Sequence, residues 1–319
     1  MVLCKNPWNG FACGQCLPCR INRRRIWTHR ILLEATQHVD NTFITLTYDE
    51  QHLPEGGHVN PEDLRKFWNR LRKAIYPARI RYYAVGEYGT DGNRPHYHAA
   101  VFGLSNCIRG ETYKDVPKSA IRYFDIHCCP KCDVVQRAWG KGNVYLGTLT
   151  KDSAGYIAQY VTKGMSTEKG VKYHATKDAS LTGLHPEFAR MSNRPGIGAL
   201  AIESIYNQIM DSPQASEVFG SHTDVPQHLL VASKKYPLGR YLTKKLREEV
   251  GYSDEQIEFL KEQREDEMLR MFVAEREATE GSDHYEKHIN YHKKKEEENV
   301  QKIRQIEGRY KLYNKGKKL

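Results

Sequence analysis

The stretch Thr42-Phe43-Ile44-Thr45-Leu46-Thr47-Tyr48 decides the fold, because β-branched and aromatic residues dominate it and favour an extended strand. A helix is predicted to follow, with Asn60 as its N-cap and Pro61 in its first turn. Apolar residues recur through this segment at helical spacing, so one face of the helix should lie in a core. These residues are Leu64, Phe67, Leu71 and Ile75, and Pro77 ends the pattern.

Two more strands are predicted downstream, over Ile80–Glu87 and His96–Gly103. The chain between them contains two glycines and an asparagine, which indicates a tight connection. Strands joined so closely should be antiparallel neighbours. A short strand near Val144–Thr148 and a helix near Ser153–Lys163 complete an α+β fold, in which a central antiparallel β-sheet has flanking helices.

Three segments of different character divide the chain of 319 residues. Residues 1–40 carry cysteines and then a basic helix. Residues 41–200 carry the predicted sheet, with a cysteine-bearing insertion at 105–142. Residues 201–319 are predicted to form a helical accessory region that contacts DNA or host replication proteins.

The longest helix predicted in the accessory region is Ser253–Thr279, with Ser253 as its N-cap. From Lys293 onward the chain mixes charges of both signs and ends in a lysine-rich stretch. Such a sequence buries little apolar surface, so we predict a basic tail that is mobile, either frayed or disordered.

The charge balance favours a polyanionic partner. The chain has 49 basic and 39 acidic residues, a net charge of +10 and an isoelectric point near 9.1. Nucleic acid is the commonest partner of this kind, although a basic protein without such a partner could have the same composition. No apolar run approaches a membrane span, and the N-terminus has no signal-peptide pattern. We therefore expect a cytoplasmic protein whose eight cysteines are thiols or metal ligands, not disulfides.

The strongest local pattern is Pro95-His96-Tyr97-His98. Side chains alternate along a strand, so His96 and His98 project from one face while Tyr97 enters the core on the other. Glu87 on the preceding strand can reach the same face as the histidines. Two histidines and a carboxylate with open positions are typical of a divalent catalytic metal, whereas the alternative is a pair of ordinary surface histidines.

A second pattern is a tyrosine pair, Tyr156 and Tyr160, four residues apart in the predicted helix and followed by Lys163. The pKa of a tyrosine hydroxyl is about 10, so the group is a poor nucleophile at neutral pH. A nearby ammonium favours the phenolate, and a metal on the other side polarises a phosphoryl oxygen. The spacing of Lys163 favours Tyr160 as the first nucleophile without deciding it. The alternative is two ordinary half-buried tyrosines.

As an ordered set these motifs resemble the HUH endonuclease superfamily. The details are more similar still to the replication initiators of gokushovirus-type microviruses, which are small single-stranded DNA phages. The resemblance covers about residues 1–200. The motifs that carry it are Cys13-Gly14-Gln15-Cys16-Leu17-Pro18-Cys19-Arg20, Asn22-Arg23-Arg24-Arg25, Phe43 to Tyr48, Gly86-Glu87-Tyr88-Gly89, Arg94-Pro95-His96-Tyr97-His98, Tyr156 to Lys163, and Met191-Ser192-Asn193-Arg194-Pro195-Gly196-Ile197-Gly198.

The resemblance implies a nickase domain with an RRM-like, ferredoxin-like sheet over residues 41–200. It implies that His96, His98 and Glu87 hold Mg²⁺ or Mn²⁺, which orients the scissile phosphate of single-stranded DNA at the phage origin. One tyrosine attacks, forms a 5′-phosphotyrosine and frees a 3′-OH that primes synthesis. The second tyrosine cleaves the regenerated origin after one round, and the released 3′-OH closes the circle.

The cysteines form two sequence clusters, Cys13-x2-Cys16-x2-Cys19 and Cys128-Cys129-x2-Cys132. One C-x2-C pair from each cluster would make a tetrahedral structural Zn²⁺ site. The predicted ligands are Cys13, Cys16, Cys129 and Cys132. The spacing between the pairs is long, and a set of reduced thiols is the alternative.

Several arginines are expected to contact DNA. In the basic N-terminal helix they interleave with apolar residues and a tryptophan, which suits a phosphate backbone or stacked bases. Two more lie near the Pro195–Gly198 loop. The alternatives are a solvated helix face and a loop whose glycines only form a turn. The expected contacts are Arg20, Arg23, Arg24, Arg25, Arg190 and Arg194.

Other functions share these features, namely an HUH transposase or relaxase, a hydrolytic metallonuclease, and a non-catalytic, basic, zinc-containing DNA-binding protein. Single-tyrosine transposases lack the second tyrosine, and relaxases usually place their tyrosine before the histidines. The sequence contains no G-x4-G-K-[S/T] loop, so we expect a host helicase to unwind the DNA, with other host replication proteins as partners. These partners place the protein in the cytoplasm of the bacterial host.

Overall fold

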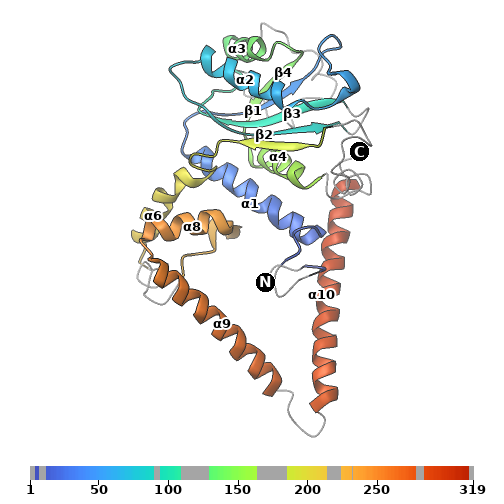
Figure 1. Cartoon of the computed structure of the whole chain (residues 1–319), viewed down its shortest axis with the longest axis vertical. Coiled ribbons are helices and arrows are strands. Elements are labelled where there is room, and N and C mark those ends of the chain that lie inside the picture. The colour runs from blue at the N-terminus through green and yellow to red at the C-terminus, as the bar shows by residue number, and fades with distance from the viewer. Residues whose placement is uncertain are drawn as a thin grey trace. The chain divides into compact units, whose positions relative to one another are not determined.

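A computed structural model describes residues 4–6, 12–89, 94–108, 129–163, 185–213, 224–231, 233–277 and 284–315 (Figure 1). The chain divides into two compact units. The sheet unit consists of Arg24–Glu203 and His228–Leu242, and the helical unit consists of Met1–Arg23, Ser204–Gln227 and Thr243–Leu319. The segment boundaries predicted from the sequence stay a prediction.

A five-stranded antiparallel sheet forms the centre of the sheet unit, in the strand order β4-β1-β3-β2-β5 (Figure 1). β3 lies between β1 and β2 and pairs with both along their length. The predicted α+β class and its four strands are confirmed, whereas the edge strand β5 lies in a stretch that was predicted as loop. The strands are β1 (Asn41–Thr47), β2 (Arg81–Tyr88), β3 (Pro95–Phe102), β4 (Val144–Thr148) and β5 (Phe188–Met191).

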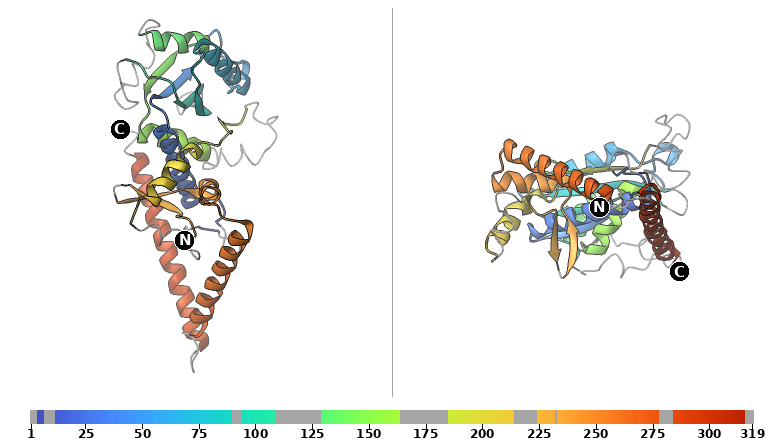
Figure 2. Two further views of the ribbon diagram at one scale, coloured as in Figure 1. Left: turned by 90° about the vertical axis from the view of Figure 1, so that its left-hand side faces the viewer. Right: turned by 90° about the horizontal axis from the view of Figure 1, so that it is seen from below.

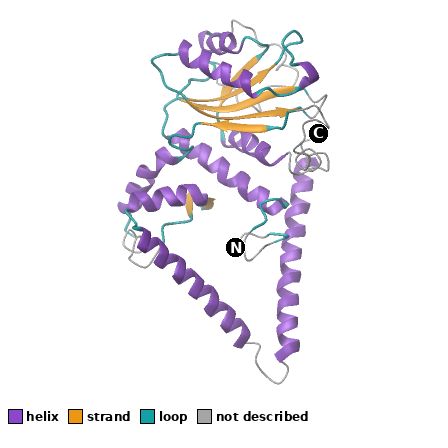
Figure 3. Cartoon of the chain, in the orientation of Figure 1, coloured by secondary structure: helices purple, strands orange, loops and turns teal. Residues whose placement is uncertain are grey.

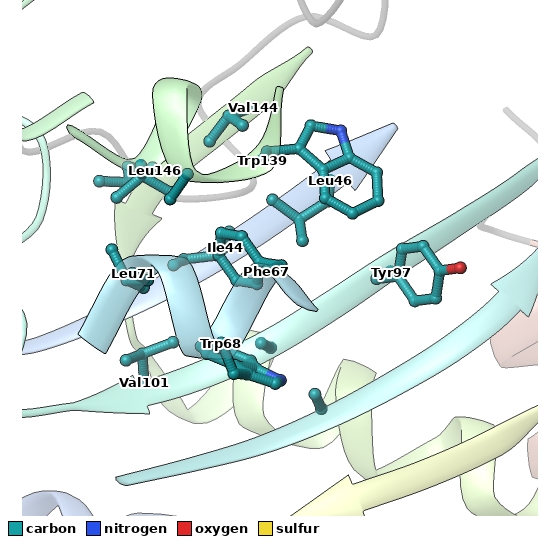
Figure 4. Close-up of a cluster of buried hydrophobic side chains, with 14 of the residues drawn as sticks. Ile44, Leu46, Phe67, Trp68, Leu71, Tyr97, Val101, Trp139, Val144 and Leu146 are labelled. Atoms are coloured by element: carbon teal, nitrogen blue, oxygen red, sulfur yellow. The ribbon is translucent and has the colours of Figure 1, made fainter. Parts of the chain in front are cut away.

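Helices α2 (Pro61–Ala74) and α3 (Pro130–Trp139) cover one face of the sheet (Figure 1). Asn60 caps α2 as predicted, because its side-chain oxygen accepts the Glu62 N–H at 2.9 Å. The apolar face of α2 meets alternate residues of the strands in a buried core. Figure 4 shows this core, formed by Ile44, Leu46, Phe67, Trp68, Leu71, Tyr97, Val101, Trp139, Val144 and Leu146.

The opposite face is covered by α4 (Lys151–Lys163) and by the part of α1 (Leu17–Thr36) that begins at Arg24, as the left view of Figure 2 shows. Phe43 lies in this second core although its neighbour Ile44 lies in the first. This is the two-residue alternation of a strand that is buried on both faces. The site described below belongs to this second face.

Residues after the sheet are mainly helical, with one short hairpin (Figure 3). Ser253 caps α9 as predicted, since its Oγ accepts the Gln256 N–H at 3.2 Å and Gln256 accepts the Ser253 N–H at 2.8 Å. The remaining elements are η1 (Glu55–Gly57), η4 (Ala199–Ala201), α6 (Ile202–Met210), β6 (His228–Val231), β7 (Lys234–Pro237), α8 (Gly239–Val250), α9 (Asp254–Glu277) and α10 (His284–Lys315).

The prediction of a frayed or disordered tail from Lys293 is wrong, because α10 continues to Lys315. This segment is rich in Glu, Lys, Gln and Arg, which are strong helix formers. Glu298 and Lys302 form a pair at helical spacing, 3.8 Å apart. Ile303 is buried, so the helix also has an apolar contact. No helix among the described residues is long and apolar enough to cross a membrane.

Replacing Phe67 with alanine should destabilise the sheet unit by about 3–5 kcal/mol, because the ring is fully buried between α2 and the sheet. Urea unfolding followed by circular dichroism measures the change. Val39→Ala is the control, since Val39 is fully exposed, and its effect should stay within about 0.5 kcal/mol. Equal effects from the two variants would contradict the packing of α2 on the sheet.

Candidate active site

The register of the strands brings Glu87, His96 and His98 together. Glu87 pairs directly with His96 across β2 and β3, and His98 pairs with Val85. All three side chains therefore project from the face of the sheet that α4 covers. Glu87 Oε1 lies 2.8 Å from His96 Nε2 and 3.1 Å from His98 Nε2. The ligand atoms of the three residues all lie within 4.8 Å of one another, so the fold assembles the set that the sequence singled out.

Neighbouring groups orient both imidazoles. His98 Nδ1 lies 2.9 Å from Thr45 Oγ1 on β1, and His96 Nδ1 lies 3.0 Å from the carbonyl oxygen of Arg94. A carbonyl oxygen only accepts, so Nδ1 of His96 carries the hydrogen and Nε2 is directed at Glu87. Partners of this kind fix the tautomer and the ring orientation of histidines that bind metals.

Glu87 is a buried and ionised carboxylate, with 1% of its surface exposed. Burial by itself raises the pKa of Glu87, but hydrogen bonds from His96 and His98 and the charges of these residues outweigh burial and bring the pKa to about 2. The side chain is therefore negative at neutral pH. Divalent cations such as Mg²⁺ prefer oxygen donors of this type.

Tyr156 on α4 reaches the same place. Its hydroxyl lies 3.4 Å from Glu87 Oε1 and 3.4 Å from His98 Nε2. Its ring stands edge-on to His98, with 5.0 Å between the ring centroids. Arg24 on α1 donates from Nε to the carbonyl oxygen of Gly155 at 2.9 Å, which holds the turn of α4 that carries Tyr156.

Tyr160 and Lys163 lie further along α4, with Tyr160 one helical turn beyond Tyr156. The side chains of Tyr160 and Lys163 lie outside the described part of the structure. Their predicted roles in catalysis therefore stay predictions.

Tyr97 points to the opposite face of the sheet, as predicted. Its hydroxyl donates to the Asn60 carbonyl oxygen at 3.0 Å, accepts the Asn60 N–H at 2.7 Å and lies 2.7 Å from the hydroxyl of Tyr48. Burial raises the pKa of Tyr97 to about 12. Tyr97 is therefore a core residue that links β3 to the start of α2, although it stands between the two histidines in the sequence.

The predicted DNA-contacting arginines lie in different surroundings. Arg24 and Arg25 each donate a hydrogen bond to a backbone carbonyl within the sheet unit. Arg190 at the edge strand and Arg194 after it are exposed. None of these contacts tests DNA binding, which stays a prediction for Arg20, Arg23, Arg24, Arg25, Arg190 and Arg194.

The loop Pro195–Gly198 is a connection built against α1. Arg30 Nε donates to the Ile197 carbonyl oxygen at 2.9 Å, and the Gly198 N–H donates to Glu34 Oε2 at 2.7 Å. Gly198 has a φ of +84°, and a Cβ there would lie 3.0 Å from the carbonyl oxygen of Arg30. The glycine is needed for this close approach, which is the turn interpretation of the motif.

The cysteines are grouped differently from the predicted zinc set of Cys13, Cys16, Cys129 and Cys132. Cys13 and Cys16 lie with Cys4 and Cys19, whereas Cys129 and Cys132 lie with Cys107. Each C-x2-C turn closes on itself beside a cysteine that is near in the fold, one at the start of α1 and the other at the start of α3. Two separate groups thus replace the single mixed set, and Cys128 lies outside the described residues.

Sequence reasoning missed Thr45 and Arg24 as supports of the site. Thr45 lies in the strand that decides the fold and pairs directly with His98, so strand pairing would have found it. Arg24 was singled out for DNA and not for its contact with Gly155, which is 131 residues away in the sequence. No local pattern signals such a contact.

A sheet that carries a carboxylate and a histidine pair, with a helix that carries a tyrosine, agrees with a known family of replication proteins. Residues 41–165 match the family described as replication-associated protein ORF2. The matched stretch begins with β1, ends just after α4 and includes every residue named above as a candidate metal ligand or nucleophile. No solved structure was found to match the chain.

Three curated relatives are proteins of small phages. The chain is 26% identical over 230 residues to replication-associated protein VP4 of Bdellovibrio phage phiMH2K, which covers 68% of this chain and 65% of the relative. It is 35% identical over 195 residues to replication-associated protein ORF2 of Spiroplasma virus 4, covering 58% and 55%. It is 29% identical over 162 residues to replication-associated protein ORF4 of Chlamydia phage 1, covering 47% and 37%. The chain spans less than two thirds of each relative, and the resemblance to microvirus replication proteins is confirmed.

Acid should remove the stabilising contribution of Glu87. Its pKa of about 2 lies below the ordinary value of 4.5, so the contribution is complete above pH 4.5 and is lost as the pH falls toward 2. We expect Glu87→Gln to be less stable than the parent at neutral pH, by an amount that shrinks below pH 4.5. Urea unfolding across this range, with EDTA present, measures the difference. A difference that is independent of pH would contradict the ionised state of Glu87.

Proposed function

We propose that this protein initiates rolling-circle replication of a small single-stranded DNA phage, by nicking and rejoining the DNA through a tyrosine. The observation that carries the proposal is the Tyr156 hydroxyl, 3.4 Å from both Glu87 and His98. This arrangement lies in a stretch that matches a family of replication-associated proteins. A phenolic oxygen beside a carboxylate and two imidazoles suits covalent catalysis on a phosphodiester.

Glu87, His96 and His98 would hold the divalent metal, Mg²⁺ or Mn²⁺. The donor set fits such an ion, because one ionised carboxylate and two oriented imidazoles direct their ligand atoms at one point. When bound, the metal polarises a non-bridging oxygen of the scissile phosphate. Thr45 and the Arg94 carbonyl hold the two rings in place for this role.

Tyr156 supplies the nucleophile. Its phenolic oxygen forms a bond to phosphorus while the bond between phosphorus and the 3′ oxygen breaks. The phenol loses its proton and the departing 3′ oxygen gains one, so the products are a 5′-phosphotyrosine and a free 3′-OH. Arg24 positions the nucleophile through its hydrogen bond to Gly155.

Tyr160 would serve the second cleavage, and Lys163 would favour a phenolate. Once replication has regenerated the origin, Tyr160 attacks it in the same way. The 3′-OH released by this second cleavage attacks the first phosphotyrosine and closes the circle. Two tyrosines one turn apart on one helix therefore allow cleavage and joining to alternate at a single metal.

The substrate we propose is single-stranded DNA at the phage origin. The net charge of +10 favours a polyanion, and the exposed Arg25, Arg190 and Arg194 can neutralise phosphates. A host helicase and host replication proteins are the proposed partners, because the sequence has no phosphate-binding loop of the helicase type. We place this reaction in the cytoplasm of the bacterial host.

The proposal predicts a covalent, metal-dependent adduct that requires Tyr156. The protein is incubated with labelled single-stranded origin DNA from the phage that encodes it, with Mn²⁺ or with EDTA, and analysed on a denaturing gel. We expect an SDS-resistant band with Mn²⁺ only, reduced at least about 100-fold in Tyr156→Phe and absent in Tyr156→Phe/Tyr160→Phe.

Tyr76→Phe is the matched control, because Tyr76 is an exposed tyrosine just after α2, and it should form the parental amount of adduct. Cleavage without any adduct would mean a hydrolytic metallonuclease. An adduct that survives in the double variant would exclude both tyrosines as nucleophiles. Binding without cleavage would favour a non-catalytic DNA-binding protein.

Removing the hydroxyl that orients His98 should weaken metal binding. We expect Thr45→Val to bind Mn²⁺ about 10–100-fold more weakly than the parent, since the imidazole loses the partner of Nδ1. Isothermal titration calorimetry measures this affinity. Thr47→Val is the control on the same strand, because the hydroxyl of Thr47 donates to the Asn143 carbonyl and not to a histidine. Equal losses in the two variants would contradict an orienting role for Thr45.

A further inference from the structure

Four cysteines at the start of the chain direct their sulfurs at one point. Cys4, Cys13, Cys16 and Cys19 have all their Sγ atoms within 4.8 Å of one another. Cys16 Sγ lies 3.3 Å from Cys19 Sγ and 3.9 Å from Cys4 Sγ. In a tetrahedral zinc site the Zn–S bonds are about 2.3 Å, which sets sulfur–sulfur separations of about 3.8 Å. The observed separations scatter around that value.

Backbone amides surround these sulfurs as they would surround thiolates. The N–H of Cys13 donates to Cys4 Sγ at 3.2 Å, and the N–H of Lys5 donates to Cys16 Sγ at 3.4 Å. Cys13 Sγ accepts the N–H groups of Gln15 and Cys16 at 3.4 and 3.3 Å. Hydrogen bonds to the charged form of a group favour that form. The segment is thus folded around the four sulfurs, although it contributes little apolar surface of its own.

Gly14 allows the turn between Cys13 and Cys16. Its φ of +72° is the left-handed conformation that side chains rarely adopt. The turn brings the Sγ of Cys13 under the amide of Cys16, three residues later. Cys16 lies immediately before α1, and Cys19 lies in its first turn. The cysteine spacing and the glycine therefore act together to close the group.

We propose that Cys4, Cys13, Cys16 and Cys19 bind one structural Zn²⁺ ion. Four cysteine thiolates in a tetrahedral arrangement are typical of zinc or of an iron–sulfur centre. The C-x2-C-x2-C spacing also occurs in iron–sulfur proteins. The compactness of the group decides for zinc, because each thiolate of a multi-iron cluster binds a different iron and the sulfurs are then spread further apart.

Zinc would fix the N-terminal segment to the start of α1. Without a metal, residues around Cys4 and Cys13 are held only by weak N–H to sulfur contacts and by an ion pair of Lys5 with Glu307. The ion closes loops between Cys4, Cys13 and α1, which stabilises a short segment that lacks a large core. This role does not depend on the proposed nicking reaction.

The second cysteine group, Cys107, Cys129 and Cys132, offers three sulfurs among the described residues. A complete tetrahedral site requires a fourth ligand, so we restrict the proposal to the four-cysteine group. The experiment must therefore separate the two groups.

Zinc content in variants that lack one group or both tests the proposal. The full chain is expressed with zinc in the medium, purified under reducing conditions without chelator, and analysed by plasma mass spectrometry. We expect Cys107→Ser/Cys129→Ser to retain one zinc per chain. Adding Cys4→Ser and Cys16→Ser to that variant should remove it. The variant that keeps the four-cysteine group should also bind Co²⁺ with the intense charge-transfer absorption of four thiolates.

The Co²⁺ spectrum keeps the test valid even if the quadruple variant folds poorly, because it is recorded on a chain with the four-cysteine group intact. Absence of zinc from Cys107→Ser/Cys129→Ser would overturn the proposal. Zinc that remains after Cys4 and Cys16 are replaced would overturn it as well. Iron with acid-labile sulfide in place of zinc would identify an iron–sulfur centre instead.

Discussion

The pairing register of β3 between β1 and β2 is the constraint on which the candidate site depends. Side chains alternate along β3, so His96 and His98 face α4 while Tyr97 faces α2. A slip of one residue would exchange these faces, placing both imidazoles in an aromatic core. The hydroxyl of Tyr97 opposes that slip, because it is buried and bonded to both backbone groups of Asn60. A polar anchor in one core thus sets the chemistry on the other face.

Glu87 shows how burial and function are connected at this site. An unpaired carboxylate with 1% exposure would be strongly destabilising, and here two imidazoles offset that cost. The same oxygen and nitrogen atoms are the ligands that our proposal assigns to a divalent metal. The protein therefore needs little rearrangement to exchange hydrogen bonds for coordination, since Thr45 and the Arg94 carbonyl hold the rings from behind.

Local patterns were enough to predict β1–β4, α2, α4 and the assembly of Glu87 with two histidines. Short-range periodicity and capping decide these features, so a single sequence contains them. The contacts of Thr45 with His98 and of Arg24 with Gly155 span 53 and 131 residues and depend on how elements pair in space. The cysteine grouping failed for the same reason, because C-x2-C spacing does not reveal which third and fourth sulfurs are near. For α10, helix propensity outweighed the mixed charge that indicated disorder.

The basic character of α1 shows why charge alone does not identify a DNA-binding surface. Arg24 holds α4 through Gly155, Arg30 holds the loop at Ile197, and Glu34 forms an ion pair with Arg81 on β2. These charged side chains satisfy backbone and carboxylate groups that folding would otherwise leave buried without partners. Replacing them would disturb the sheet unit as well as any contact with DNA. Arginines such as Arg190, exposed at the edge strand, therefore give the cleaner measure of phosphate binding, because their loss leaves the packing of α1 and α4 intact.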